Sequence, residues 1–191
     1  LLKSLRRYST TRKTKNSEID SMAEQTMNSG IKSTLRQAGV AEITFSTAML
    51  RIEERCELAM TRIHSQPGFR TKLIDLPRRT GNCGGNDTSA LCLRPGEWLL
   101  ISDTTDPADL REQLAEGIES GFAAVYDQSD GLAVFRLDGP AAPWLLGKLS
   151  GLDFLAAVDE GEHCARTRMG AVAVLIHYHE AQPGQFVFDL V

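Results

Sequence analysis

The sequence predicts an α+β fold built from two subdomains of β-α-β type, with mostly antiparallel sheets. Two observations point to this class. Short runs of alternating apolar and polar residues, typical of strands with one buried face, recur along the chain. Few residues separate consecutive runs, as at Pro95-Gly96 and at Ser129-Asp130-Gly131, and short connections favour antiparallel pairing. Helix-start signals occur in the same chain, between these runs.

The strand pattern covers residues 41–45, 50–63, 91–93, 98–102, 122–127, 132–137, 163–169, 171–178 and 185–191. Residues 69–76 favour a short helix, and residues 77–89 form a glycine-rich loop. The spacing of the glycines in this loop matches neither the dinucleotide nor the P-loop fingerprint, which predicts a surface loop without a phosphate site.

The first well-marked helix follows residue 105. Asp106 is a candidate N-cap and Pro107 suits the first helical position. The apolar stripe and the expected stop are Leu110, Leu114, Ile118 and Gly121.

A second helix opens at Gly139-Pro140, where Pro143 is tolerated because it falls in the first turn. Its buried stripe and its end are predicted at Leu145, Leu146, Leu149 and Gly151.

These signals divide the chain into a leader, residues 1–32, and two subdomains, residues 33–121 and 122–191. The leader is polar, and its first 15 residues carry six basic side chains and no acid. It is interpreted as a disordered or non-native extension, with a transit peptide or a nucleic-acid arm as alternatives. The net charge of the 191-residue chain is −4, which argues against nucleic acid as the main partner.

The cysteines are Cys56, Cys83, Cys92 and Cys164. They contain no C-x-x-C pair and do not form a recognisable disulfide framework, so we expect reduced thiols in a cytoplasmic protein. No apolar stretch approaches the roughly 20 residues of a membrane span.

Catalytic and metal signals are weak in this sequence. His177 and His179 share one strand face, but spacing identifies no third ligand, so an edge-strand pair reaching solvent is the preferred interpretation over metal binding. His163 and Cys164 are adjacent and point to opposite faces, so they do not pair as a nucleophile and its base. The sequence therefore predicts no catalytic residue and no bound metal.

Two further groups of residues are candidates for binding. Arg166 and Arg168 share a strand face and suit either a carboxylate, such as a folate tail, or cross-strand ion pairs. Glu97, after its turn, is expected to be exposed, and Trp98 and Trp144 are expected in a core or an interface. These side chains predict attachment to a partner rather than chemistry.

The stretches LRPGEWLLIS, YDQSDGLAVFRLDGPAAPWLLGKLSGLDF and GEHCARTRMGAVAVLIHY resemble the sarcosine oxidase gamma subunit family. The likeness covers about half of the chain, in order. The residues that carry it are Pro95, Glu97, Trp98 and Leu99, then Asp127 and Ser129, then Arg136, Gly139 and Pro140, then Leu152 and Asp153, and finally Cys164, Ala165, Thr167 and Arg168.

This resemblance implies a fold like that of the folate-binding aminomethyltransferase and of the N-terminal domain of the tRNA-modifying GTPase. It also implies a non-catalytic subunit that contacts the alpha subunit of a complex with beta and delta subunits. That complex oxidises sarcosine to glycine. Its FAD, FMN and NAD lie on alpha and beta, its zinc on delta and its tetrahydrofolate on alpha.

The family's last strand is usually followed by a helix, but this sequence stops at Val191, which is interpreted either as a truncated C-terminus or as a degenerate member of the family. We therefore expect Phe186, Phe188 and Leu190 to be exposed and to favour association, including a homodimer of the isolated chain. The interface candidates are Glu97, Trp98, Trp144, Phe186 and Phe188. The rival prediction is a stand-alone folate-binding or aminomethyltransferase-like protein, motivated by Arg166 and Arg168.

Overall fold

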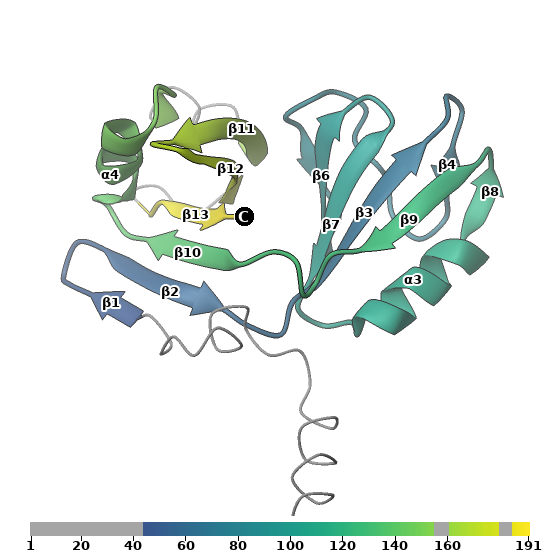
Figure 1. Cartoon of the computed structure of the whole chain (residues 1–191), viewed down its shortest axis with the longest axis horizontal. Coiled ribbons are helices and arrows are strands. Elements are labelled where there is room, and N and C mark those ends of the chain that lie inside the picture. The colour runs from purple at the N-terminus through teal and green to yellow at the C-terminus, as the bar shows by residue number, and fades with distance from the viewer. Residues whose placement is uncertain (1–43, 155–160, 180–184) are drawn as a thin grey trace, which may run out of the picture.

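The computed structural model describes residues 44–154, 161–179 and 185–191. The leader and the first expected strand up to residue 43 lie outside this part of the chain. Two antiparallel sheets pack face to face, with one helix on the outer side of each (Figure 1). This arrangement confirms the predicted α+β class with mostly antiparallel sheets. Within these residues, no helix is long and apolar enough to cross a membrane.

Sheet A has the strand order β1-β2-β10-β13-β12-β11, and all neighbours are antiparallel. Its strands are β1 (Thr44–Ser46), β2 (Arg51–Arg55), β10 (Val134–Asp138), β11 (His163–Met169), β12 (Val172–His179) and β13 (Val187–Leu190).

Sheet B has the order β5-β6-β7-β3-β9, and a third, two-stranded sheet joins β4 to β8. The bounds are β3 (Ala59–Ser65), β4 (Arg70–Thr71), β5 (Cys83–Gly84), β6 (Thr88–Arg94), β7 (Glu97–Ser102), β8 (Ile118–Ser120) and β9 (Ala123–Asp127). The Pro95-Gly96 turn joins β6 to β7. Gly96 has φ 82°, and a Cβ there would lie 2.9 Å from the Ser65 carbonyl oxygen, so both conformation and space require glycine.

Helix α3 (Pro107–Glu116) begins as predicted, because the Asp106 side chain accepts a hydrogen bond from the backbone N–H of Ala108 at 2.9 Å. It ends at Gly117, earlier than expected, and Ile118 leaves the helix for strand β8. Helix α4 (Ala142–Leu149) ends at Ser150. The expected short helix at residues 69–76 is wrong, since this segment contains β4 and irregular backbone.

One apolar cluster lies between the two sheets, and one lies on the outer face of each sheet. Between the sheets, Leu91 and Leu99 of sheet B pack in one cluster with Leu175 of sheet A. Outside sheet B, α3 buries Leu110 and Leu114. Outside sheet A, α4 packs with the following residues: Leu146, Phe154, Ile176, Tyr178 and Phe188. Burial of apolar surface on both sides of both sheets is the main term that stabilises the fold.

The sheets exchange strands across the division expected after residue 121. Strand β2 precedes all of sheet B in the sequence, yet it pairs with β10 in sheet A. Strand β9 follows Gly121, yet it pairs with β3 in sheet B. The chain therefore enters sheet A, builds sheet B and returns to sheet A (Figure 1).

The expected exposure of the last strand is wrong. Phe188 is 1% exposed and meets Phe154 edge to face at 5.8 Å between ring centroids. Phe186 and Leu190 are half-buried against the same cluster. Helix α4 covers this face of sheet A, so these side chains stabilise the chain's own core and do not form an exposed patch.

Candidate functional site

Strand β7 places the carboxylate of Glu97 and the indole of Trp98 on opposite faces of sheet B, because side chains alternate along a strand. Glu97 points toward sheet A and is only 1% exposed, so its expected exposure is wrong. Trp98 points outward, packs with α3 and donates its indole N–H to the Pro77 carbonyl at 2.6 Å. Both side chains are buried within the described part of the chain, and their role as interface candidates stays a prediction.

Glu97 lies at the centre of an arginine cluster that crosses between the sheets. Arg62 donates through Nε at 2.9 Å and also through its terminal nitrogen. Arg94 donates to the other carboxylate oxygen, and Arg166 reaches across from β11 at 3.1 Å. His64 Nε2 lies 3.7 Å away. We call Glu97, Arg62, Arg94, Arg166 and His64 the Glu97 cluster.

The carboxylate of Glu97 is held in its charged form. Burial alone would raise the pKa of Glu97, but hydrogen bonds from Arg62, Arg166 and Arg94 outweigh it and lower the pKa to about 2. A carboxylate with such a pKa stays charged near neutral pH and cannot act as a general base or acid there. Its physical role is to join strands of both sheets.

A second buried carboxylate, Asp189 on β13, has a similar environment on sheet A. Arg136 binds it in bidentate fashion at 2.8 and 2.7 Å, His179 donates at 2.7 Å, and Arg55 lies 3.4 Å away. Burial would raise the pKa of Asp189, but His179 and Arg136 lower it well below its usual range. We call these four residues the Asp189 cluster.

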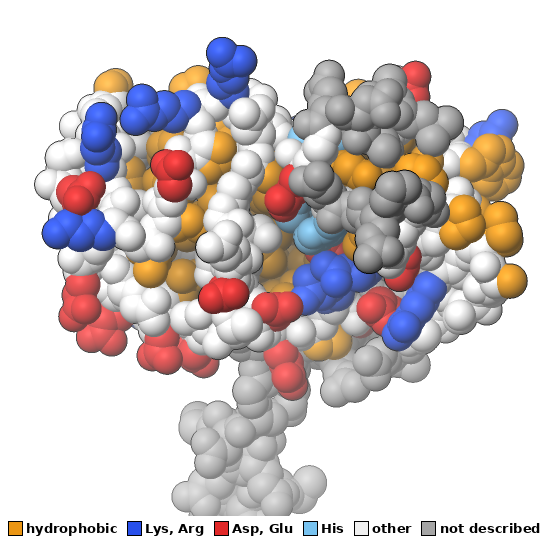
Figure 2. Space-filling model, turned by 180° about the vertical axis from the view of Figure 1, so that it is seen from behind, with side chains coloured by type: hydrophobic (Ala, Val, Ile, Leu, Met, Phe, Trp, Pro, Cys, Tyr) orange, Lys and Arg blue, Asp and Glu red, His pale blue; other side chains and the backbone are white. Residues whose placement is uncertain are grey.

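Strand register extends the Asp189 cluster into a polar row across the inner face of sheet A. Arg136 is opposite Asp189, Asp189 is opposite His177, and His177 is opposite Cys164. Paired residues on neighbouring antiparallel strands share a face, so these side chains lie side by side. Figure 2 shows arginine or lysine side chains and histidine side chains meeting near the middle of the molecule.

The histidines do not lie on an edge strand, so that interpretation is wrong. Strand β12 pairs with both β11 and β13, and His177 is 1% exposed. Burial lowers the pKa of His177 despite its hydrogen bond to the Glu162 carboxylate at 2.7 Å, so its imidazole is neutral at neutral pH. The rings of His177 and His179 stack with centroids 4.0 Å apart.

His177 also meets groups that the sequence pattern did not connect to it. Donor atoms of Cys83, Glu162 and His177 lie within 4.8 Å of one another, and so do those of His177, His179 and Asp189. Cys83 comes from β5 of sheet B, about 80 residues before Glu162 in the sequence. No local spacing could have found this convergence.

The two candidate arginines of β11 have different partners. Arg166 belongs to the Glu97 cluster, whereas Arg168 donates to the Ala171 carbonyl in the next turn at 3.0 Å. Both remain exposed, so their binding of a ligand carboxylate stays a prediction. The geometry favours the structural alternative for Arg166, because its guanidinium already contacts a carboxylate of the chain.

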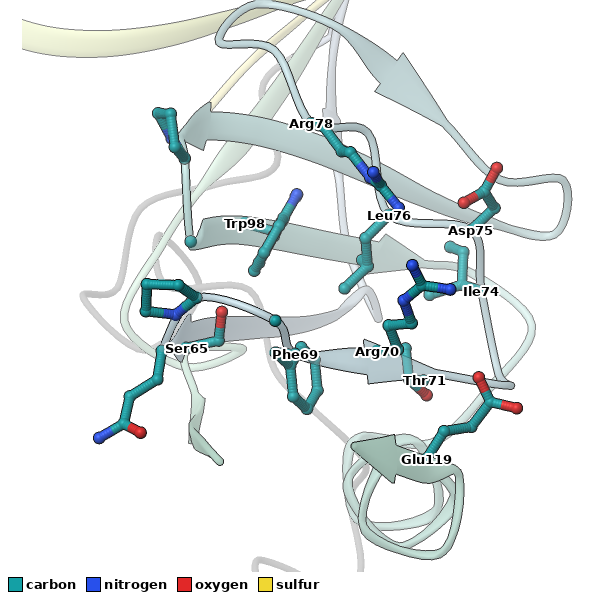
Figure 3. A pocket seen from close by; sticks show the side chains of 15 residues that line it. Ser65, Phe69, Arg70, Thr71, Ile74, Asp75, Leu76, Arg78, Trp98 and Glu119 are labelled. Carbon is teal, nitrogen blue, oxygen red and sulfur yellow. The ribbon is translucent and has the colours of Figure 1, made fainter. Parts of the chain in front are cut away.

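A pocket of about 430 Å³ opens on the outer side of sheet B. Its wall contains Trp98, Phe69 and Leu76, and Arg70 and Arg78 stand beside them (Figure 3). The Phe69 and Trp98 rings lie 6.5 Å apart and are inclined by 41°. Asp75 and Glu119 also line the pocket, so its aromatic walls and mixed charges suit a flat small molecule that carries polar or charged groups.

Trp144 is the one interface candidate whose side chain is plainly at the surface. It is 65% exposed on α4, with the Lys148 ammonium 5.6 Å from its ring. Leu149 on the same helix is 46% exposed. An exposed tryptophan beside an exposed leucine is typical of a contact surface.

These features define an antiparallel two-sheet α+β protein whose buried charged groups hold its sheets together. The structure is similar to a chain of the heterotetrameric sarcosine oxidase from Corynebacterium sp. U-96 in complex with pyrrole 2-carboxylate. The match has a TM-score of 0.64 and 22% sequence identity, and it covers 83% of this chain and 85% of that chain. The likeness predicted from the motifs is therefore present in the fold. No family model and no curated protein matches the sequence.

Proposed function

We propose that this chain is a gamma-like, non-catalytic subunit of a sarcosine-oxidase-like complex, in which it contacts an alpha-type subunit. The observation that carries the proposal is the extent of the structural match, which spans most of both chains. In this proposal the flavins, NAD and the tetrahydrofolate site belong to other subunits.

The roles of the motif residues support this proposal. Glu97 and Arg136 belong to the two ion clusters described above. Ser129 accepts a hydrogen bond from the Met60 backbone N–H at 2.9 Å and donates to Asp127 at 2.8 Å. Each of these side chains has its partners within the chain, as expected of groups that maintain a shape. Co-purification of the tagged chain from its source should recover a flavin-containing oxidase subunit, and recovery of the chain alone would contradict the proposal.

We predict that Trp144 contributes to this assembly. Trp144→Ala should weaken binding of the flavoprotein partner by about 10- to 100-fold, because buried interface tryptophans commonly contribute 2 kcal/mol or more. Biolayer interferometry with the isolated flavoprotein partner measures the dissociation constant of each variant. The matched control is Phe122→Ala, since Phe122 is 64% exposed but lies beside sheet B. Equal losses in both variants, or none in Trp144→Ala, would place the interface elsewhere.

A second candidate, a stand-alone tetrahydrofolate-binding protein, is favoured by the pocket beside Trp98. We expect calorimetry with tetrahydrofolate to show sub-millimolar binding that Arg70→Ala weakens about tenfold, because the ligand's carboxylates would lose a guanidinium partner. Arg168→Ala is the control for the alternative site on β11. An absence of heat with the unmodified chain would remove this candidate, and a loss confined to Arg168→Ala would move the site to β11.

A further inference from the structure

We propose that Cys83, Cys164, His177 and Glu162 form a structural zinc site that links the two sheets. Thiolate, imidazole and carboxylate groups are the ligands that zinc accepts, and four of them complete a tetrahedral structural site. Two sulfurs among the four favour zinc over magnesium or calcium, which prefer oxygen.

The geometry brings these four groups together from separate elements. The donor atoms of Cys83, Glu162 and His177 lie within 4.8 Å of one another. Cys164 is directly opposite His177 on the adjacent strand, and its thiol is close enough to that of Cys83 for each to shift the pKa of the other. Small shifts of side chains would bring each donor to the roughly 2.0–2.3 Å that zinc requires.

The backbone around the site is already fixed. The N–H of Cys164 donates to the Gly81 carbonyl at 2.7 Å, and Asn82 forms a bridge with His163. Both contacts join the β5 segment of sheet B to strand β11 of sheet A. A metal bound here would therefore connect two elements whose positions the backbone has set, which lowers the entropy cost of binding.

The protonation states suit a cation. The neutral imidazole of His177 is the form that coordinates metal, and Glu162 has its pKa lowered mainly by its hydrogen bond to His177. The Cys83 thiol, and after it Arg166, lower the pKa of the Cys164 thiol, although burial opposes them, while Cys164 and burial raise the pKa of Cys83. On binding, the two thiols release their protons to solvent. The hydrogen bond between His177 and Glu162 opens as both donor atoms turn to zinc.

The neighbouring triad of His177, His179 and Asp189 is a poorer site. Arg136 already donates to both oxygens of Asp189, and His179 shares one of them. A cation there would lie beside a guanidinium group and would have to displace it. Asp189 instead holds His179, whose ring stacks on that of His177.

Cobalt titration of the purified, reduced full-length chain tests the site. We expect one Co²⁺ per chain, with a thiolate-to-metal charge-transfer band that zinc displaces. The band should fall by about half in Cys83→Ser and in Cys164→Ser, and vanish in the double variant. Cys92→Ser is the matched control: Cys92 is a buried thiol on the other face of sheet B, and its loss should leave the band unchanged.

A substitution at a less buried ligand tests the site even if the substitutions of the buried cysteines prevent the chain from folding. Glu162→Gln, at a side chain that is 33% exposed, should keep the full band but weaken cobalt affinity at least about tenfold. Zinc at about 100 times its Kd should raise the Tm of the unmodified chain by about 5–10 °C. The proposal is overturned if the reduced chain shows no charge-transfer band, if both single serine variants keep the band at its full intensity, or if zinc leaves the Tm unchanged.

Discussion

Replacing Glu97 by glutamine should destabilise the protein by about 3 kcal/mol and lower its Tm by about 6–12 °C. The substitution keeps the shape of the side chain but removes the one negative charge that Arg62, Arg94 and Arg166 share. Three guanidinium groups would then face one another across a buried amide. This expected loss of stability lies at the low end of the range for breaking a buried ion pair, because Arg94 and Arg166 remain partly hydrated. Thermal unfolding followed by circular dichroism measures it.

Two further measurements check this interpretation. Adding Arg94→Gln to Glu97→Gln should restore part of the lost stability, because it removes one repelling charge.

The pKa of Glu97, lowered from 4.5 to about 2, also predicts that acid destabilises the protein. The ionised Glu97 carboxylate contributes its full share of the free energy of unfolding above about pH 4.5, and this share is lost as the pH falls toward 2. The unmodified chain should therefore lose this share on acidification, whereas Glu97→Gln, which has no carboxylate at this position, should not. Identical acid curves would contradict a structural role for Glu97.

Asp189→Asn should have a comparable effect, about 3 kcal/mol or a Tm lower by about 6–12 °C. The amide can keep one hydrogen bond from Arg136 but loses the bidentate, charge-assisted pair and the partner of His179. Asp103→Asn is the matched control, because Asp103 shares the Arg55 partner yet its side chain is 58% exposed. That change should cost less than about 0.5 kcal/mol. Equal losses of stability in Asp189→Asn and Asp103→Asn would show that stability depends on the ion pairs of Arg55 and not on the buried carboxylate.

Local features of the sequence predict the longer strands and both described helices. They miss the short strands β4, β5 and β8, and the single run expected at residues 50–63 is two strands, β2 and β3, of different sheets. The loop expected at residues 77–89 also contains β5 and the start of β6. The N-cap of Asp106 and the turn at Pro95-Gly96 depend on neighbours within a few residues, so their chemistry is visible in the sequence. The sequence predicts too long a helix α3, because Ile118 fits the apolar stripe of the helix. In the structure Ile118 instead belongs to β8, which pairs with β4. Local propensity is a weak prior when tertiary pairing decides.

The candidate sites could not be predicted in the same way. The Glu97 cluster joins Arg62, Glu97 and Arg166, which are separated by tens of residues. Their meeting depends on which strands pair and in which register, and alternation along one strand carries no information about either. The shared face of His177 and His179 was visible, but the burial of β12 required knowing that β13 returns beside it.

The interrupted path of the chain through sheet A has a consequence for the order of assembly. All strands of sheet B lie within residues 59–127, so this central segment contains its own pairing partners. When β3 and β9 pair, they bring the ends of β2 and β10 close together, because only a few residues separate each of these strands from its neighbour. Folding of sheet B has then already ordered the long connection between β2 and β10, so joining these two strands costs little further chain entropy. Strand β2 can pair with β10 as though the two were adjacent in sequence. A nascent chain whose residues up to about 128 have left the ribosome would hold a folded centre, with β2 still lacking its partner β10.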